Sequence, residues 1–330
     1  MLRRQAWIVL IAAYILFPAA WLMPADWTNT SPAFVLTWWF LFLLRTFELH
    51  YGIALVVIGG VALIVKRWRL AVPALLLGLV LMRPVWQAAW PNADADITSP
   101  NSAGLKVMSV NLLMINQQID PMLAEIEAAD PDVILLQEYA YQWHRAMQKR
   151  MLERWPHYIG VPQDDSFGIA IYSRLPLENA TAQLPLGEGF IPQIKATVQL
   201  GDKPIDLYNI HLLPPRTLWY TTEHRLEFAD LLKHLHQQQG AYVIAGDFNF
   251  TTTSPQAAAL HERGLKDVHD IAGSGLGLTW PVNGVVRYMP VPGIRFDHVY
   301  LSEELTAPEA AMGVGPGSDH RPIITTIRWR

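Results

Sequence analysis

The stretch from Ala241 to Asn249 carries the residues whose types and spacing first point to chemistry. Its apolar start, Tyr242 to Ala245, is typical of a buried strand, and Gly246 then lets the backbone approach a neighbour closely. Asp247 and Asn249 follow two positions apart, which puts both side chains on one face of an extended chain. A carboxylate and an amide placed in this way suit a hydrated divalent metal or a phosphate. The alternative is a turn in which both side chains bond the local backbone.

Other polar side chains follow apolar runs in the same manner. The runs that we expect to be strands span residues 106–111, 132–136, 168–172, 193–200, 205–210, 294–301 and 323–327. The polar residues of interest are Asn111, Glu138, His211, Asp247, Asn249, Asp297, Asp319 and His320. Nearly all of them stand at the tips of such runs. Strand tips of a sheet sandwich can gather on one rim, so we expect these side chains to share one site.

Helical patterns separate some of these strands. Asp120 can cap a helix that ends near Ala129, and residues 221–239 form the longest helical candidate outside the apolar N-terminal region. His234 and His236 lie on this second helix, but a spacing of two does not place them on one helix face. We therefore interpret them as surface residues and not as a metal-binding pair.

The composition divides the chain into two unlike parts. Of its 330 residues 51% are hydrophobic; residues 1–90 hold 7 Lys/Arg and 2 Asp/Glu, and residues 91–330 hold 18 and 27. This predicts a membrane region joined to an acidic soluble domain of about 240 residues. An acidic domain does not attract nucleic acid as a basic one does. The absence of Cys excludes disulfides, thiolate metal sites and Cys nucleophiles, and it is compatible with either side of a membrane.

Three apolar segments in residues 1–90 predict transmembrane helices, near residues 7–23, 51–66 and 70–86. The first could also be a signal peptide, but Leu22, Met23 and Pro24 make a poor small-residue cleavage site, so we expect a retained helix. The apolar segment 34–47 is short for a crossing and suits an interfacial or re-entrant segment better. Residues 91–104, which are rich in Pro, Asn, Asp and Ser, predict a linker, and the soluble domain then spans 105–330.

The basic residues predict an orientation for this region. Arg3 and Arg4 favour a cytoplasmic N-terminus, and Lys66, Arg67 and Arg69 favour a cytoplasmic loop. Both regions can be cytoplasmic if segment 34–47 does not cross the membrane, because the first two spans then bring the chain out and back. The third span then places the soluble domain on the outer face. We therefore expect a multi-pass protein of a bacterial inner membrane whose soluble domain is periplasmic or extracellular.

Seven short motifs occur between about residue 104 and the C-terminus. They are Ser-Val-Asn at 109–111, Leu-Gln-Glu at 136–138, Ser-Arg-Leu-Pro at 173–176, Asn-Ile-His at 209–211, Gly-Asp-Phe-Asn at 246–249, Phe-Asp-His at 296–298 and Ser-Asp-His-Arg-Pro at 318–322. Their types and order resemble the endonuclease/exonuclease/phosphatase superfamily. The resemblance implies an α/β fold, a four-layered sandwich of two packed mixed sheets flanked by helices, here preceded by transmembrane helices. It also implies metal-dependent hydrolysis of a phosphate ester.

The resemblance implies roles for the acidic and amide residues. Glu138 resembles the Mg²⁺ ligand of the superfamily, with Asn111 close by, and Asp319 resembles a second carboxylate beside the metal. Asp247 resembles the residue that orients or deprotonates the attacking water, and Asn249 resembles a donor to the phosphate. Carboxylates and an amide also favour a hard ion such as Mg²⁺ or Mn²⁺ over zinc on chemical grounds.

The basic residues receive their roles in the same way. His320 resembles the histidine that contacts the scissile phosphate, with Asp297 orienting it, and His211 resembles a second histidine near the phosphate. In the superfamily a basic residue often precedes the strand that Ile194 begins; the nearest residues here are Gln193 and Lys195, and Lys195 is our candidate for a phosphate contact. Leu113 stands where the exonuclease III branch has an acidic residue, which is a departure from the nuclease pattern.

The leading function is thus a membrane-anchored, divalent-metal-dependent phosphoesterase that hydrolyses a phosphodiester by metal-assisted attack of water. Its expected partners are a lipid bilayer and a phosphoester substrate, either a lipid or a nucleic acid, and the sequence implies no protein partner. A DNA or RNA nuclease of the same superfamily is one alternative, which the acidic domain opposes. The other is a non-catalytic membrane-anchored binding protein, although the chain keeps the acidic residues and the final histidine that a degenerate member would lack.

Overall fold

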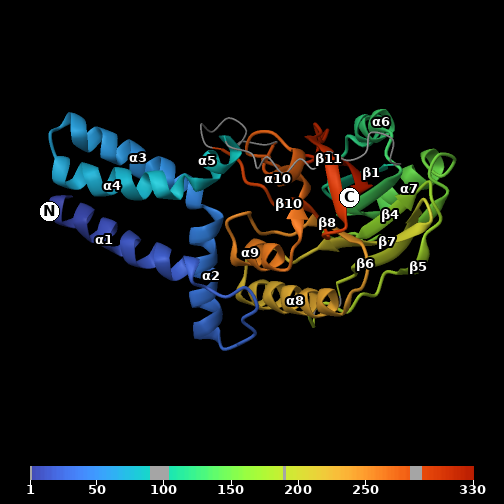
Figure 1. The fold of residues 1–330 in the computed structure, drawn as a ribbon, viewed down its shortest axis with the longest axis horizontal. Helices are drawn as coiled ribbons and strands as arrows, with labels where there is room; N and C mark the ends of the chain where they lie inside the picture. The colour runs from blue at the N-terminus through green and yellow to red at the C-terminus, as the bar shows by residue number, and fades with distance from the viewer. Residues whose placement is uncertain (1, 90–103, 189–190, 283–291) are drawn as a thin grey trace.

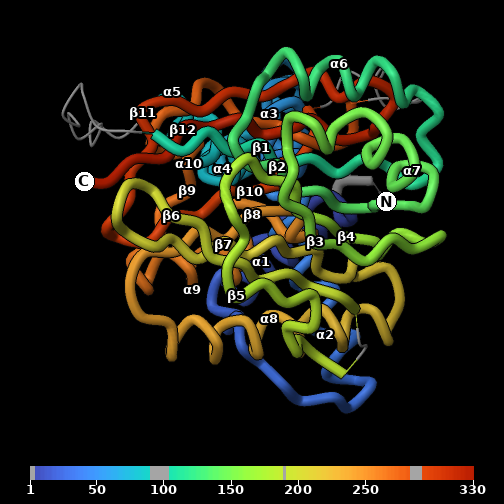
Figure 2. Tube along the Cα trace, turned by 90° about the vertical axis from the view of Figure 1, so that its right-hand side faces the viewer, coloured from blue at the N-terminus to red at the C-terminus, as the bar shows by residue number. Residues whose placement is uncertain are grey.

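Two six-stranded mixed sheets pack face to face at the centre of the molecule. The structure is a computed structural model that describes residues 2–89, 104–188, 191–282 and 292–330. The first sheet has the strand order β11-β12-β1-β2-β4-β3, and the second has the order β5-β6-β7-β8-β10-β9. Helices cover the outer face of each sheet, as the side view shows (Figure 2). The four-layered α/β sandwich expected from the sequence is therefore confirmed.

The strands of the first sheet are β1 (Leu105–Asn111), β2 (Val133–Gln137), β3 (His157–Val161), β4 (Ile169–Ser173), β11 (Leu305–Met312) and β12 (Ile323–Trp329). Those of the second sheet are β5 (Glu178–Thr181), β6 (Ile194–Leu200), β7 (Lys203–His211), β8 (Tyr242–Asp247), β9 (Lys266–Asp267) and β10 (Asp297–Leu301). The helices of this part are α6 (Ile119–Ala129), α7 (Tyr141–Arg150), α8 (Leu218–Gln237), α9 (Pro255–Glu262) and α10 (Val268–Ala272).

Alternation of side chains along each strand builds three apolar layers. Val107 of β1 and Val243 of β8 face each other's sheets in the central core. Met108, the next residue of β1, faces α6 and α7 in an outer core, and Ile244 of β8 faces α8 and α9 in another. Because successive strand residues point to opposite faces, every second residue of these strands belongs to the same layer.

Strand direction brings several chain ends to one rim of the sandwich. β1 and β2 run parallel in the first sheet, and β7 and β8 run parallel in the second, with His211 opposite Asp247 in register. β10 runs antiparallel to β8, so its first residue, Asp297, also lies opposite Asp247. The last residues of four strands and the first residue of a fifth therefore meet at the same end.

The N-terminal region consists of α1 (Leu2–Trp21), α2 (Pro32–Thr46), α3 (Glu48–Ile64), α4 (Trp68–Leu81) and α5 (Arg83–Ala89). Within the described ranges, α1 alone is long and apolar enough to cross a membrane. The count rises to three if α2 with α3, bent by 64°, and α4 with α5, bent by 52°, each form one broken span. The linker expected at 91–104 falls, apart from Gly104, outside the described residues.

Helix α2 lies between the other N-terminal helices and the sandwich. Figure 1 shows α1, α3 and α4 side by side and extending away from the sheets, whereas α2 runs across their near ends. Trp38 and Phe42 of α2 are fully buried in the same core as Phe228 of α8 and Ile244 of β8. The helix therefore packs as part of the outer layer of the second sheet.

Candidate active site

The site is the polar end of the central core. Asn111, His211, Asp247 and Asp297 each extend the row of residues that faces the opposite sheet in its own strand, and all four are buried. Alternation explains this position, because Val107 and Val243 of the central core lie an even number of residues before Asn111 and Asp247. The same pleat that buries valine in the middle of the sandwich thus presents a carboxylate or an amide at its rim.

Eight of the nine site residues predicted from the sequence come together at this rim. They are Asn111, Glu138, His211, Asp247, Asn249, Asp297, Asp319 and His320. The sequence pattern of polar residues at strand tips therefore predicted the composition of the cluster.

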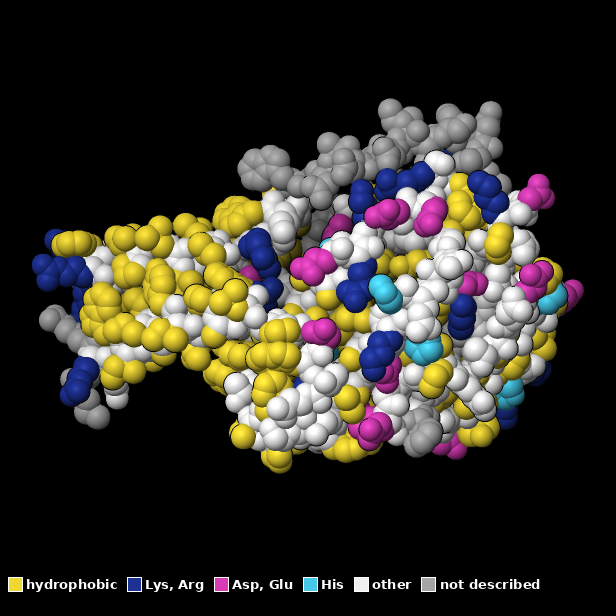
Figure 3. All heavy atoms as spheres, turned by 60° about the horizontal axis from the view of Figure 1, so that its bottom comes forward, with side chains coloured by type: hydrophobic (Ala, Val, Ile, Leu, Met, Phe, Trp, Pro, Cys, Tyr) yellow, Lys and Arg dark blue, Asp and Glu magenta, His cyan; other side chains and the backbone are white. Residues whose placement is uncertain are grey.

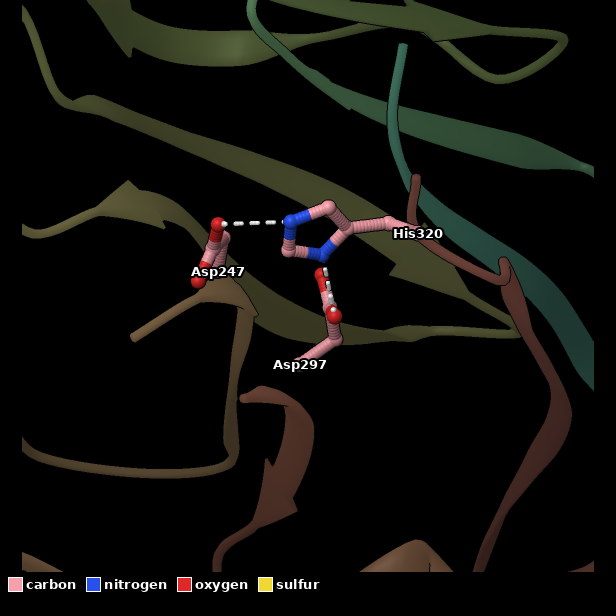
Figure 4. Close-up of side chains that lie close together, drawn as sticks. All are labelled: Asp247, Asp297 and His320. Atoms are coloured by element: carbon pink, nitrogen blue, oxygen red, sulfur yellow. Dashed lines mark hydrogen bonds and ion pairs between the residues drawn. The ribbon is translucent and has the colours of Figure 1, made fainter. Parts of the chain in front are cut away.

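Asp297, His320 and Asp247 form a buried chain of charges (Figure 4). The His320 Nδ1 lies 2.7 Å from the Asp297 Oδ2, and its Nε2 lies 3.7 Å from the Asp247 Oδ2. Burial opposes a charged imidazole, but the two carboxylates outweigh it and raise the pKa of His320 to about 10. Burial also raises the pKa of Asp247 to about 7, partly offset by His320. At neutral pH His320 is therefore a cation held between two acids.

Asn111 ties Glu138 to this chain. Its Nδ2 donates to the Glu138 Oε1 at 3.2 Å and to the Asp247 Oδ2 at 3.1 Å. The backbone N–H of Met114 donates to the other Glu138 oxygen at 3.0 Å, and Glu138 itself takes a left-handed turn at φ 51°. Burial raises the pKa of the Glu138 carboxyl, and no Lys or Arg among the described residues forms an ion pair with it.

Asp247 and Asn249 form the local bonds of a turn, and one Asp247 oxygen also faces the cluster. The Asp247 Oδ1 accepts the backbone N–H of Asn249 at 3.0 Å, and the Asn249 side-chain amide donates to the Leu212 carbonyl at 2.9 Å. These are the local bonds of a turn, and they leave the Asp247 Oδ2 facing the histidines. Gly246 is required here, because its φ is +142° and a Cβ would lie 1.8 Å from the Ile210 carbonyl oxygen.

His211 completes the group on the other side of Asp247. Its Nε2 lies 3.7 Å from the Asp247 Oδ2, and burial lowers the pKa of its imidazole to about 3, so it is neutral at pH 7. The Gln193 side-chain amide bonds both backbone groups of His211. Its Nε2 donates to the His211 carbonyl at 2.8 Å, and its Oε1 accepts the His211 N–H at 2.7 Å. The sequence carried no feature that assigned this supporting position to Gln193.

The donor atoms fit a hard divalent ion. The Asp319 Oδ2 accepts the indole N–H of Trp280 at 2.9 Å, whereas its Oδ1 is buried and has no hydrogen-bond partner among the described residues. Ligand atoms of Asp247, Asp297 and His320 also lie within 4.8 Å of one another. A protonated imidazole has no lone pair to offer, however, so the oxygens of Glu138 and Asp319 suit a cation better than this group does.

Lys195 is the one predicted site residue that the structure does not bring to the cluster. Its strand neighbours Ile194 and Ala196 face the central core, so Lys195 points to the opposite, helix-covered face of β6. There its ammonium lies 2.9 Å from the Asp206 carboxylate and 3.0 Å from the Gln238 Oε1. The prediction that Lys195 contacts the phosphate conflicts with this placement, because alternation along the strand turns it away.

The cluster opens into a cavity of about 270 Å³. One wall carries Glu138, Asp247, Asn249, Asp319 and His320, and the loop after β7 contributes Pro214, Pro215 and the exposed Arg216. A further part of the lining, called the α2 wall here, comes from the end of α2 and the residue that follows it, with Phe42, Leu43, Thr46 and Phe47. Neither Arg216 nor this wall was predicted from the sequence, because neither stands at the tip of an apolar run.

Comparisons with known proteins agree with this geometry. Several solved structures share the fold, and at 14–19% identity their likeness concerns the fold alone. A humanized D. rerio TDP2 is 19% identical with a TM-score of 0.57, covering 69% of this chain and 100% of its own. An endonuclease/exonuclease/phosphatase from Bacteroides vulgatus is 14% identical with a TM-score of 0.56, at 69% and 100% coverage. The human Nocturnin catalytic domain with a bound sulfate anion is 18% identical with a TM-score of 0.51, at 69% and 96% coverage.

The family comparison is more specific. No sequence among the curated proteins matches the chain. A family model described as the Endonuclease/Exonuclease/phosphatase family matches residues 108–320, which include every residue of the cluster. The chain therefore belongs to the endonuclease/exonuclease/phosphatase family, whose members are metal-dependent hydrolases of phosphate esters.

Proposed function

We propose that this protein is a membrane-anchored phosphoesterase that hydrolyses a phosphodiester by attack of an activated water molecule. The oxygen of water forms a bond to phosphorus, one P–O ester bond breaks, and the products are a phosphomonoester and an alcohol. The observation that carries the proposal is the position of the Asp247 Oδ2, which lies 3.7 Å from the Nε2 of both histidines and 3.1 Å from the Asn111 amide. The proposed base Asp247, the cation His320 and the carboxylates proposed to hold the metal thus line one cavity.

Glu138 and Asp319, with Asn111 beside them, would hold the Mg²⁺ or Mn²⁺ ion. The unpartnered Asp319 Oδ1 and the buried Glu138 carboxylate support this assignment. When bound, the ion neutralises charge on the phosphoryl oxygens. Asn111 donates to Glu138 and so sets the direction of that carboxylate before any ion arrives.

Asp247 takes the proton of the attacking water. Burial raises the pKa of its carboxyl to about 7, which makes it a stronger base than an exposed aspartate. Its Oδ1 is fixed by the Asn249 backbone N–H, so the Oδ2 is the oxygen that receives the proton. The Asn249 amide has a second N–H beyond the one that it gives to Leu212, and this N–H donates to a phosphate oxygen.

The two histidines have different charges and hence different tasks. His320 is a cation at neutral pH and stabilises the negative charge that builds on the phosphoryl oxygens. Asp297 keeps that cation in place through the 2.7 Å contact with Nδ1. His211 stays neutral because burial lowers the pKa of its imidazole to about 3, so it acts as a hydrogen-bonding group.

The N-terminal helices support a multi-pass anchor with the domain on the outer side. The N-terminus and the connection between α3 and α4, which carries Lys66 and Arg67, lie together at the end away from the sandwich (Figure 1). Lys and Arg side chains gather at that end of an otherwise apolar surface (Figure 3). By the positive-inside rule this end is cytoplasmic, and the domain at the opposite end is periplasmic or extracellular.

A pair of reporter fusions tests the anchor. We expect a reporter joined after residue 90 to be active only if it requires export, for example alkaline phosphatase. Activity of a cytoplasm-dependent reporter alone would contradict the orientation.

The hydrolytic proposal is tested with purified full-length protein in detergent. We expect bis(p-nitrophenyl) phosphate to be hydrolysed with Mg²⁺ or Mn²⁺ and not with EDTA, and p-nitrophenyl phosphate to be a poorer substrate. Asp247→Ala serves as the matched inactive control. If neither EDTA nor this substitution lowered the rate of hydrolysis, the whole activity would come from a contaminant. The proposal would then be wrong.

A nuclease is the second candidate function. The D. rerio TDP2 structure complexed with a single strand DNA product shares the fold at 18% identity, with a TM-score of 0.55 and coverage of 68% of this chain and 99% of its own. The excess of acidic over basic residues in 91–330 opposes it, because nucleic acid binding relies on neutralising phosphates with Lys and Arg. The family match and the intact cluster oppose the third reading, a non-catalytic binding protein.

A further inference from the structure

We propose that the substrate is an amphiphilic phosphodiester, one ester group of which is a long hydrocarbon chain that lies against α2. The proposal rests on the phosphodiesterase function proposed above and names the substrate class of that same site. It follows from the mixed lining of the cavity, which combines the catalytic groups with the apolar end of α2.

Apolar residues from the end of α2 and the bend after it line the same cavity as the catalytic groups. Phe42, Leu43 and Phe47 line the same cavity of about 270 Å³ as Asp247 and His320. Leu43 and Phe47 are only partly buried, so each keeps apolar surface that a ligand can cover. An ester group attached to a phosphate at the catalytic wall would therefore meet hydrocarbon, and burying it there is favourable in proportion to the apolar area covered.

Helix α2 is held firmly enough to act as a wall. The Trp39 indole donates to the Pro215 carbonyl at 2.7 Å, and Pro215 itself lines the cavity. The Arg45 guanidinium donates to the Thr253 carbonyl, and the Thr253 hydroxyl returns a bond of 2.6 Å to the Arg45 carbonyl. These contacts attach α2 to the loops that follow β7 and β8, the two strands that end in His211 and Asp247, so its side chains keep a fixed position relative to the phosphate site.

The wall continues into the surface of the N-terminal helices. Phe47 stands at the 64° bend between α2 and α3, and α3 carries exposed apolar residues such as Val57, Ile58 and Val61. The surface of these helices is apolar over most of the face seen in Figure 3. A hydrocarbon chain that leaves the cavity past Phe47 thus meets the surface that a bilayer would cover.

The same cavity is poorly suited to nucleic acid. Arg216 is the one Lys or Arg among its described lining residues, whereas binding a nucleic acid strand relies on a row of cations along the backbone. The residues that α2 adds to the lining are mostly apolar, and they offer no cation to a second phosphate. The lining therefore favours a lipid-like diester over a polynucleotide.

A matched pair of chromogenic diesters tests this inference on the full-length protein in dodecyl maltoside. p-Nitrophenyl methyl phosphate and p-nitrophenyl hexadecyl phosphate share the reacting centre and the nitrophenolate leaving group, and they differ only in the tail. We expect kcat/KM with Mg²⁺ to be about tenfold or more higher for the hexadecyl diester, as burial of methylene groups in an apolar pocket predicts. A single-stranded DNA oligonucleotide is assayed in parallel.

Two substitutions on α2 separate tail recognition from simple partition into micelles. Leu43→Gln places an amide on the cavity wall, and we expect it to lower the ratio of hexadecyl to methyl kcat/KM severalfold. Leu36→Gln makes the same change at an exposed position of the same helix, 52% accessible and outside the cavity, and we expect it to leave the ratio unchanged. Both variants sit in the same micelles, so partition of the substrate affects them equally. Turnover of the methyl diester also shows that each variant is folded.

The outcomes distinguish the two proposals. No hydrolysis of either diester with Mg²⁺ or Mn²⁺ would defeat the phosphodiesterase function itself. Hydrolysis of both diesters with a ratio near one, or with a ratio that Leu43→Gln does not change, would overturn the inference and leave the function standing. Faster cleavage of the oligonucleotide than of the hexadecyl diester would overturn it in favour of a nuclease.

Discussion

The Asp297 carboxylate holds His320 with one ring nitrogen 2.7 Å away, while the other ring nitrogen lies 3.7 Å from Asp247. The contact with Asp297 fixes the orientation of the His320 imidazole. The Asp297 and Asp247 carboxylates together raise the pKa of His320 to about 10. A cation is therefore in place without substrate, and under the proposed function the charge that develops on the phosphate would meet a preorganised partner.

We expect Asp297→Asn to lower kcat on the order of a hundredfold and to change KM little. The asparagine keeps the shape of the side chain but removes the charge that sustains the imidazolium. Steady-state kinetics on bis(p-nitrophenyl) phosphate measure the effect, and His320→Ala should be at least as slow. A variant with near-normal kcat would show that the charge of His320 is dispensable.

Metal binding and proton transfer should separate at Glu138 and Asp247. We expect Glu138→Gln to require about tenfold or more Mg²⁺ for half-maximal activity, because it removes a negative charge from the proposed metal site. Asp247→Asn should instead lower kcat about a hundredfold at saturating Mg²⁺.

A second readout of this prediction does not depend on turnover. Mg²⁺ should raise the unfolding temperature of the wild type and of Asp247→Asn, since a ligand that binds the folded state stabilises it, and should have much less effect on Glu138→Gln. An equal shift in all three proteins would remove Glu138 from the metal site.

Lys195 and Arg216 offer a paired test with one substitution type. We expect Lys195→Met to retain wild-type kinetics, because its ammonium pairs with Asp206 on the far face of β6. Arg216→Met should raise KM about tenfold, since the guanidinium that it removes lines the cavity and attracts a phosphate. The reverse result would mean that the substrate approaches from the other face of the second sheet.

Glu227 should make stability depend on pH. Burial, with a smaller effect of Glu223, raises the pKa of its carboxyl to about 8, and the Leu213 N–H donates to it at 2.8 Å. The folded protein keeps this proton between about pH 4.5 and 8, whereas the unfolded chain loses it, so the contribution is present below pH 4.5 and is lost as pH rises toward 8.

The matching measurement compares the wild type with Glu227→Gln, which cannot titrate. We expect the unfolding temperature of the wild type to fall between pH 5 and 8 by about 5 °C more than that of the variant. Tryptophan fluorescence in detergent reports both transitions. Parallel curves for the two proteins would place the carboxyl in a more polar environment than its burial implies.

The cluster could be predicted because its residues follow two simple rules. Asp247 ends an apolar run and Gly246 precedes it, and the two-residue period of a strand then fixes which face the carboxylate takes. The same rule places Lys195 on the other face, since Ile194 and Ala196 face the core. The prediction of Lys195 as a phosphate contact followed the residue type and did not take this period into account.

The wall of α2 could not be predicted in this way. A 15-residue helix rich in Trp, Phe and Leu has the same pattern whether it packs on a bilayer or on a protein. Only the fold shows that Trp38 and Phe42 lie against α8 and β8. Helix α7 and the edge strand β3 were missed for a related reason, because they contribute few fully buried residues and no polar tip.

The packing of Trp38 and Phe42 extends the apolar core of the domain beyond the segment that the family model matches. A fragment that began at Gly104 would contain the whole matched segment, yet it would lack the aromatic side chains that complete the outer core beside Phe228. Such a fragment would expose this core to water and would tend to aggregate. The smallest piece that folds like the intact chain therefore includes α2, although α2 lies more than sixty residues before the family match begins.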